Sequence, residues 1–537
     1  MKNTIAPSTL TLSTLALAVA ASLLAFEATA DTVTDWNTYT ILAAKGGTSP
    51  TTGTASIALN SNVTTRIAAI EARAVFDAVN AIDQFSFASY YYQRSKPAGV
   101  TAQSAAAAAA QAAHDVLIGT LPNPAANANW APTITWLNSQ LASDLLALGV
   151  SGSDPGIAAG EAAAAAALAA RANDYAAIRT TYTPSTNLAV SGTGAVVANA
   201  TGNPGVGLWR PSNGAAGVID PATGAPTGFD ASGNILPTAA IDFNWKIVTP
   251  FGLAIAAKQS LVAAVPPSLA IGSSEYNAEL KYVKTHGQNS LNPGNRTNDQ
   301  TLQALYYKSD AEIYVNEAAR LASSNRGFTL DQNAKLFAGL DSALADARIA
   351  AWQSKYDLLF WRPISAINAN PDGSISNYTW LPLATTPSHP SSTSGHSTTV
   401  AAGAEILRAF FKSDKITKKG VAVSLTTVPW LVGTNNGTGK VDPLVFGSDA
   451  TTRNITTFSQ LQLESGRSRI YLGVHFGTDN YQGLTLGVTV ADAIIKAKND
   501  VATSDLNIYY GDTSVANIKN LKSILIADSD NTGYYGL

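Results

Sequence analysis

Apolar residues recur at steps of three and four along much of this chain, which is the spacing of helices that bury one face. The first such run extends from Thr64 to Ile82. Alanine-rich segments follow at 102–119, 135–148 and 156–175, and alanine has the highest helix propensity. The helical pattern returns at 275–285 and at 299–323. The chain is therefore predicted to be mainly helical.

The clearest helix signal begins at Thr329. Thr329 and Gln332 have the spacing of a capping box, and a long run of apolar positions follows them. We expect this helix to end at Pro363, because the proline ring cannot continue a helix. Lys355 and Arg362 are seven residues apart and would then project from the same helix face.

The neighbours of Lys355 and Arg362 are mostly large and apolar: Trp352, Leu358, Leu359, Phe360 and Trp361. Such a surface is poorly suited to water, so we favour an inward-facing pair of cations over a solvated cationic stripe. We expect an inward-facing pair of cations to have a functional role inside the protein.

Two segments depart from the helical pattern. Lys2, an apolar run and the sequence Ala28-Thr29-Ala30 mark residues 1–30 as a cleaved secretory signal. The mature protein is then expected to be secreted or periplasmic, with no membrane anchor. Residues 181–238 are rich in Gly, Pro, Asn, Ser and Thr, and they are predicted to form an irregular insertion. Residues 31–537 are interpreted as one helical domain whose catalytic half is 329–498.

Composition narrows the choice of partners. Charged residues make up 13% of the chain and the formal net charge is −3, so the sequence has no electrostatic footprint for nucleic acid. Cysteine is absent, so stability must come from a large core rather than from disulfides. The single methionine is Met1. A mature chain without sulfur suits work among strong oxidants, although composition drift in an exported protein explains it equally well.

A second group of candidate residues is Ser394-Gly395-His396. It follows a loop rich in Pro, Ser and Thr and precedes a helical run at 398–411. Gly395 is therefore placed at a helix N-terminus, where free amides and the helix dipole favour an anion. The alternative is an ordinary serine cap with a surface histidine nearby.

The third group is Ser468-Arg469, followed by His475 and Asp479. Arg469 and His475 are six residues apart, so the chain must bend to bring them to one site. Asp479 lies one turn beyond His475 and is placed to hold its second ring nitrogen. The alternatives are an ion pair between Arg469 and Asp479 and a structural role for His475.

Taken together, the three groups supply three cations, a hydroxyl, a glycine amide and two imidazoles, which is what a site for a tetrahedral oxyanion needs. In this order they resemble the signature shared by vanadium-dependent haloperoxidases and the phosphatidic-acid-phosphatase type 2 superfamily. Two departures are Thr393, where the family usually has proline, and the long segment between Ser397 and Arg467. Neither departure removes a ligand type. The resemblance extends to 74–82 and 345–355 and leaves 181–238 unassigned.

This resemblance implies a vanadate site. His475 would bind vanadium through a ring nitrogen, and His396 would act as acid and base on hydrogen peroxide. Lys355 would polarise the bound peroxide for attack by a halide. The remaining contacts to the oxyanion would come from Arg362, Ser394, Gly395 and Arg469, with Asp479 orienting His475.

The resemblance also implies the fold and the substrates. The fold would be all-α, a helical-bundle protein built on two four-helix bundles with long loop insertions and with the anion at one bundle's end. The substrates would be hydrogen peroxide, a halide and small organic acceptors.

Halide preference is expected to depend on His389, five residues before Ser394. At this position the chloride-oxidising fungal members carry an aromatic ring, and the algal bromide-oxidising members carry a histidine. Prolines on either side of the Ser388-His389 pair restrict the backbone and should hold the imidazole in one direction, near His396. We therefore expect bromide and iodide to be oxidised in preference to chloride, with Trp352 and His389 lining the halide approach. The alternative is a loop histidine that points into solvent.

Two other functions fit the same residues. One is a periplasmic acid phosphatase with His475 as nucleophile and His396 as the acid for the leaving group. The other is a non-catalytic anion-binding protein on a decayed site. The intact set of site residues argues against the second. The long spacer, Trp352 and the absence of sulfur favour the haloperoxidase over the phosphatase.

Overall fold

A computed structural model describes thirteen stretches of the chain: 31–45, 58–84, 87–176, 187–190, 194–197, 205–210, 240, 242–289, 295–373, 375, 379–426, 452–498 and 500–509. The expected signal segment, residues 1–30, and most of the insertion 181–238 lie outside these residues.

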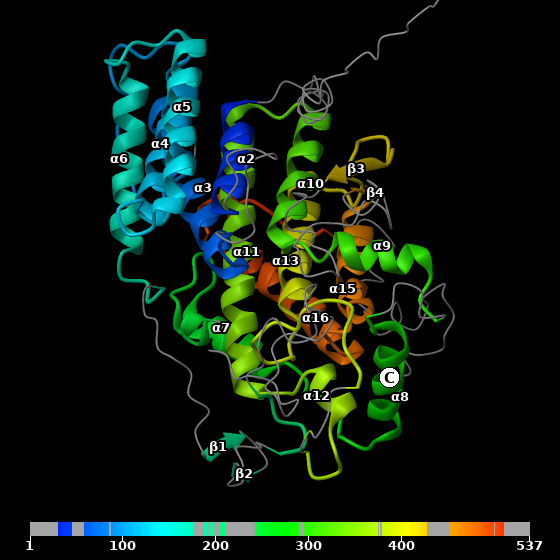
Figure 1. Cartoon of the computed structure of the whole chain (residues 1–537). Helices are drawn as coiled ribbons and strands as arrows, with labels where there is room; N and C mark the ends of the chain where they lie inside the picture. Colours follow the sequence, from blue (N-terminus) through cyan, green and yellow to red (C-terminus); the bar gives the residue numbers. More distant parts are fainter. Residues whose placement is uncertain are drawn as a thin grey trace, which may run out of the picture.

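The first half of the chain forms one group of packed helices: α2 (Thr32–Ala44), α3 (Ser61–Asp83), α4 (Ser104–Thr120), α5 (Ala131–Leu148) and α6 (Pro155–Arg171). Helix α4 contacts α2, α3, α5 and α6. Small residues allow the close contact of α4 with α6, because a side chain at Gly160 would begin only 2.7 Å from the carbonyl oxygen of Ala108. This group stands at the upper left of Figure 1.

The second half builds a bundle from α10 (Ala311–Arg326), α11 (Leu330–Leu358), α13 (Gly395–Phe411), α15 (Phe458–Tyr471) and α16 (Gly477–Ala497). Helix α13 contacts each of the other four. Helix α11 also packs along α3, so it joins the two groups of helices (Figure 1). A single large cluster of buried apolar side chains runs through both groups. The fold is all-α and made of helical bundles, as predicted.

Shorter elements surround these bundles: η1 (Ala128–Trp130), η2 (Phe243–Ile247), α7 (Ile255–Ala263), α8 (Ser274–His286), α9 (Asn298–Tyr306), α12 (Pro363–Asn368) and η5 (Val501–Thr503). Two small antiparallel pairs are also present, β1 (Asn187–Val190) with β2 (Gly194–Val197) and β3 (Val423–Thr426) with β4 (Thr452–Ile455). None of the helices described is long and apolar enough to span a membrane.

The predicted helices at 64–82, 102–119, 135–148, 156–175 and 275–285 correspond to α3, α4, α5, α6 and α8. The helical pattern predicted at 299–323 corresponds to two helices. It divides into α9 and α10, with Asp310 in extended backbone immediately before α10. The Asp310 side chain does not cap α10 but pairs with Nζ of Lys45 at 2.7 Å.

The end of α11 also differs from the prediction. The capping box of Thr329 and Gln332 forms as expected, but the helix stops at Leu358 rather than at Pro363. Arg362 instead lies just before α12, whose first residue is Pro363. Proline disfavours helical backbone in the preceding residue and suits the first helical position. Lys355 and Arg362 therefore do not share one helix face.

Candidate oxyanion site at the end of the second bundle

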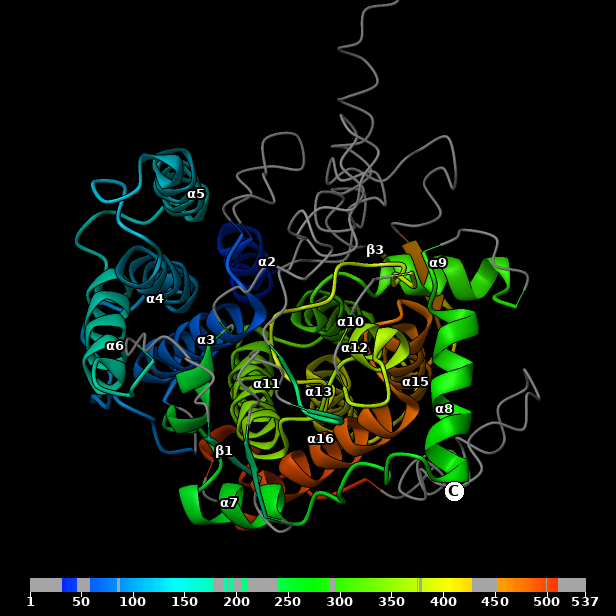
Figure 2. The same ribbon diagram turned by 60° about the horizontal axis from the view of Figure 1, so that its bottom comes forward.

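The candidate residues meet at one end of the second bundle, where α11 and α15 finish and α13 and α16 begin. Figure 2 turns the molecule so that the lower end in Figure 1 comes forward. Lys355 is in the last turn of α11 and Arg469 in that of α15. Ser394 caps α13, and His475 lies in the short connection before α16. The bend expected between Arg469 and His475 is this connection.

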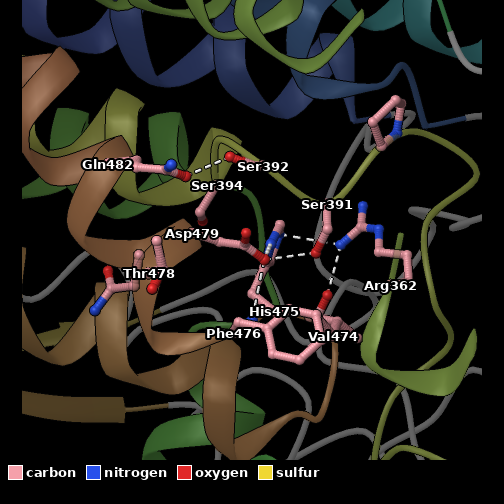
Figure 3. Close-up of polar contacts among 12 residues, drawn as sticks. Arg362, Ser391, Ser392, Ser394, Val474, His475, Phe476, Thr478, Asp479 and Gln482 are labelled. Atoms are coloured by element: carbon pink, nitrogen blue, oxygen red, sulfur yellow. Dashed lines mark hydrogen bonds and ion pairs between the residues drawn. The ribbon is translucent and has the colours of Figure 1, made fainter. Parts of the chain in front are cut away.

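His475 is oriented from both sides of its ring. Its Nδ1 lies 3.2 Å from Oδ2 of Asp479, and its Nε2 lies 3.1 Å from Nη1 of Arg362 (Figure 3). A guanidinium can only donate, so Nε2 is the acceptor and Nδ1 carries the proton that Asp479 accepts. Burial, reinforced by Arg362, holds the pKa of His475 well below its ordinary value. The ring is thus neutral, with a lone pair on Nε2.

The carboxylate of Asp479, which accepts from His475, is itself held in place by two other hydrogen bonds. Its Oδ2 accepts from the Ser391 hydroxyl at 2.5 Å and from the backbone N–H of Phe476 at 3.0 Å. Burial raises the pKa of this carboxyl, while Ser391 and Phe476 lower it. The expected role of Asp479 in holding the second ring nitrogen therefore agrees with the geometry. Ser391 was missed, and its position in a serine-rich loop gives no sequence signal.

Arg362 connects three segments of the site. Its Nε donates to the carbonyl oxygen of His389 at 2.9 Å, and its Nη1 to that of Val474 at 2.6 Å. Its Nη2 lies 2.9 Å from Nδ1 of His389. Burial lowers the pKa of Arg362 to about 9, partly offset by Asp479.

Lys355 is fully buried and donates from Nζ to the carbonyl oxygens of Pro390, at 2.8 Å, and Ser391, at 3.0 Å. Burial, then the nearby Arg362, holds its pKa well below the usual value. Its hydrogen-bond partners are carbonyl oxygens rather than carboxylates, so an anion bound in the site would favour its charged form. The inward orientation predicted for Lys355 and Arg362 is confirmed.

Arg469 retains a donor for a ligand. Its Nη1 donates to the carbonyl oxygen of Tyr307 at 2.9 Å. Its Nε is buried and has no hydrogen-bond partner among the residues that the structure describes. Burial lowers the pKa of Arg469 to about 10, and the field of Asp310 raises it. Asp310, rather than Asp479, is thus the carboxylate that acts on Arg469.

Ser394 and Gly395 begin helix α13 as predicted. The Ser394 side chain accepts from the backbone N–H of Ser397, so the ordinary cap is real, and the residue is fully buried. A side chain at Gly395 would begin 2.8 Å from Nη1 of Arg348 and 3.1 Å from the Trp352 ring. Glycine is required here because a cation and an indole cover the helix N-terminus.

The two remaining histidines have different surroundings. His396 is partly exposed, and its Nε2 lies 3.1 Å from the carbonyl oxygen of Ser309. A carbonyl can only accept, so Nε2 carries the proton and Nδ1 is open to receive another. Burial and Arg469 hold the pKa of His396 well below its usual value.

His389 is buried, which contradicts the alternative of a solvent-facing loop histidine. Its ring lies 4.8 Å from that of Trp352, so these two residues neighbour each other as expected. Nδ1 of the His389 ring lies 2.9 Å from Nη2 of Arg362 and 3.2 Å from the carbonyl oxygen of Pro390, and no hydrogen bond joins it to His396 within the described part of the chain. Arg362, the residue before α12, reaches this loop with its Nε and Nη2, which donate to the carbonyl oxygen and the ring of His389.

These features suit a tetrahedral or trigonal-bipyramidal oxyanion such as vanadate. An imidazole lone pair, a buried unpaired guanidinium N–H and a glycine at a helix N-terminus converge with the ammonium of Lys355. These groups are cations, hydrogen-bond donors or a basic nitrogen, and these are the groups that an oxyanion requires.

Comparison with known proteins agrees with this site. Residues 335–503 match the family model described as the VCPO second helical-bundle domain, a range that contains all the candidate residues. Vanadium chloroperoxidase of Curvularia inaequalis is 26% identical over 259 residues, which are 40% of this chain and 42% of that protein. The match thus spans less than half the length of that relative.

Two solved structures share the fold. A bacterial vanadium-dependent iodoperoxidase superimposes with a TM-score of 0.59 at 17% identity, covering 86% of this chain and 94% of that one. A holo-type bacterial vanadium-dependent chloroperoxidase gives 0.57 at 17% identity, covering 83% and 93%. In its second helical-bundle domain and in its overall fold, this chain is therefore similar to vanadium haloperoxidases.

Proposed function

We propose that this chain is a vanadate-dependent haloperoxidase, which uses hydrogen peroxide to oxidise a halide to hypohalous acid. The observation that carries the proposal is the state of His475. Its Nδ1 proton is held by Asp479, so the Nε2 lone pair faces the guanidinium of Arg362 and would be available to bind vanadium.

The residues that would hold vanadate are His475 through Nε2, together with Lys355, Arg362, Ser394, Gly395 and Arg469. When bound, vanadate supplies a Lewis acid that activates hydrogen peroxide toward a halide. Arg362 must release Nε2 of His475 to admit this ligand. Its hydrogen bonds to the carbonyls of His389 and Val474 keep the guanidinium beside the site meanwhile.

His396 is proposed to move the protons of peroxide. Its Nε2–H is held by Ser309, so the proton would be taken up and returned at Nδ1. A neutral ring, favoured by the lowered pKa, starts the cycle as a base. Lys355 would donate to a peroxide oxygen, because its ammonium is buried beside the same loop.

Bromide and iodide are the proposed halides. The approach would be lined by Trp352 and His389, whose rings lie 4.8 Å apart. Burial, then the charges of Lys355 and Arg362, holds the pKa of His389 well below its usual value, and the hydrogen bond from Arg362 would fix the direction of its ring. The products would halogenate small organic acceptors outside the site, which suits the proposed secretion of the protein.

The test is a pair of assays on one purified preparation, freed of metal and then supplied with orthovanadate. Bromide oxidation with hydrogen peroxide should appear only with vanadate, and hydrolysis of a phosphate ester should be weak. Vanadate-inhibited ester hydrolysis without halogenation would overturn the proposal and assign His475 as a phosphatase nucleophile.

A further inference from the structure

Arg348 is a buried cation of α11 that none of the three sequence motifs contains. It precedes Lys355 by seven residues and Trp352 by four on the same helix, and only 5% of its surface is exposed. Its guanidinium carbon lies 4.4 Å from the centre of the Trp352 ring. The spacing places Arg348, Trp352 and Lys355 along one face of α11.

Most of the hydrogen-bonding capacity of Arg348 is unused. Its Nε donates to Oδ1 of Asn62 at 2.8 Å, which is its one hydrogen bond within the described part of the chain. Glu312, Asp310 and Asp242 act on it through their charge, but none of them forms an ion pair with it among these residues. Nη1 and Nη2 are therefore donors held in place by Asn62 and Trp352.

These donors face the helix end where the oxyanion is expected. Nη1 of Arg348 would be 2.8 Å from a side chain at Gly395, so it lies directly beside the first residue of α13. The positive charge of Arg348 also contributes to the lowered pKa values of Lys355, His389, His396 and Arg469. Electrostatically, it belongs to the same site.

We infer that Arg348 is a fourth cation of the oxyanion site, donating from Nη1 and Nη2 to an oxygen of the bound anion beside the Gly395 amide. The inference rests on the oxyanion pocket of the proposed function, but not on the halide reaction. A planar guanidinium presents two parallel donors, so Arg348 would add both charge and orientation to the anion.

The experiment measures anion binding, not turnover. Equilibrium dialysis of the purified full chain with orthovanadate, and separately with inorganic phosphate, gives the two dissociation constants. Arg348→Gln should weaken both by about 10- to 100-fold, as expected for one charge-assisted hydrogen bond. Arg348→Lys should recover part of this, because it restores the charge without the paired donors.

Two further variants control for structure and charge. Asn62→Ala removes the partner of Arg348 Nε and should weaken anion binding less than Arg348→Gln does. Arg326→Gln removes a cation at the last residue of α10, where its guanidinium donates to the carbonyl of Lys415, and should leave both affinities unchanged. Thermal melts confirm that each variant is folded.

Folded Arg348→Gln protein that binds both anions as tightly as the wild type overturns the inference, and so does a wild type that binds neither anion. Weakened binding of both anions supports it, even if the wild type oxidises no halide. In that case the haloperoxidase proposal fails while the role of Arg348 stands.

Discussion

At the scale of single residues, the site depends on which nitrogen of each histidine carries a proton. Asp479 and Arg362 set this for His475, and Ser309 sets it for His396. The hydrogen bonds come from separate parts of the chain, so no sequence motif could show them. The sequence motifs did predict the types of residue in the site. The candidates from all three motifs lie at this one end of the second bundle.

His475→Ala should abolish peroxidase activity, because the structure places no other imidazole lone pair against Arg362 Nη1 among the described residues. Vanadate should still bind weakly through Lys355, Arg362 and Arg469. Vanadium content after gel filtration, measured beside bromide oxidation, checks this. Full activity with stoichiometric vanadium in the variant would show that another residue binds the metal.

His396→Ala should lower turnover by about 10²–10⁴-fold while changing vanadate affinity much less, since a positioned acid–base contributes on that scale. The turnover number of the variant at saturating peroxide, and its dissociation constant for orthovanadate measured by dialysis, separate the two effects. His114→Ala is the matched control, because His114 pairs with Asp115 and Asn138 on another part of the surface. A variant with normal turnover and lost vanadium would make His396 a ligand.

His389→Phe should shift the ratio of bromide to chloride oxidation toward chloride. The change removes the acceptor for Arg362 Nη2 and leaves an aromatic ring against Trp352. Steady-state rates for chloride, bromide and iodide at matched pH test it. Efficient chloride oxidation by the wild type, unchanged in the variant, would exclude His389 from the mechanism.

At the scale of elements, helical periodicity predicted most helices but failed where the backbone changes direction. The prediction that Lys355 and Arg362 share one helix face was wrong, because α11 ends at Leu358. Leu359 then has left-handed backbone, with φ 49°. Helical periodicity also indicates a further residue on the site-facing side of α11. Arg348, four residues before Trp352 and seven before Lys355, follows the same helical spacing.

The N-terminus of α13 can be tested with two glycines of that helix. Gly395→Ala should chiefly weaken anion binding, since the new methyl would begin 2.8 Å from Nη1 of Arg348 and push that guanidinium out of its place. Gly403→Ala should instead cost about 1–3 kcal/mol of stability, because its methyl would lie 2.6 Å from Val315 in the packed core. For each variant, urea unfolding measures the stability and dialysis with phosphate measures the anion affinity. Equal effects of the two variants on anion affinity would contradict this account.

At the scale of the whole molecule, α11 carries a buried carboxyl that links stability to pH. Asp341 accepts from Asn316 at 2.9 Å and from Asn37 at 3.4 Å, and burial raises its pKa to about 7. A carboxyl whose pKa is raised on folding stabilises the fold while it stays protonated. That stabilisation is fully present below the unfolded pKa and is lost as pH rises to the folded pKa.

The melting temperature of the wild type should therefore fall as pH rises from about 4 to about 7 and then level off. Burial also raises the pKa of Glu317 to about 7 and of Asp346 to about 6, which adds to the same trend. Asp341→Asn should reduce the slope, because the amide has no proton to lose. A calorimetric series across this range checks it, and an identical slope in the variant would remove Asp341 from the explanation.

The all-α fold and the meeting of three distant motifs could be predicted, because periodicity and a shared signature carry that information. The partners of the site residues could not. Ser391, Ser309 and Asn62 are ordinary polar residues in sequence, and only packing brings them to Asp479, His396 and Arg348. Asp310, the carboxylate acting on Arg469, comes from the break between α9 and α10 that the pattern missed.

The proposed vanadate site can be located directly in a crystal of the full chain grown with orthovanadate. An anomalous difference map at the vanadium edge locates the metal independently of its oxygens. We expect one peak, bonded to Nε2 of His475, with Arg362 moved off that nitrogen and Lys355 and Arg469 around the oxygens. Vanadium bound elsewhere, or a pocket without it at saturating orthovanadate, would contradict the account.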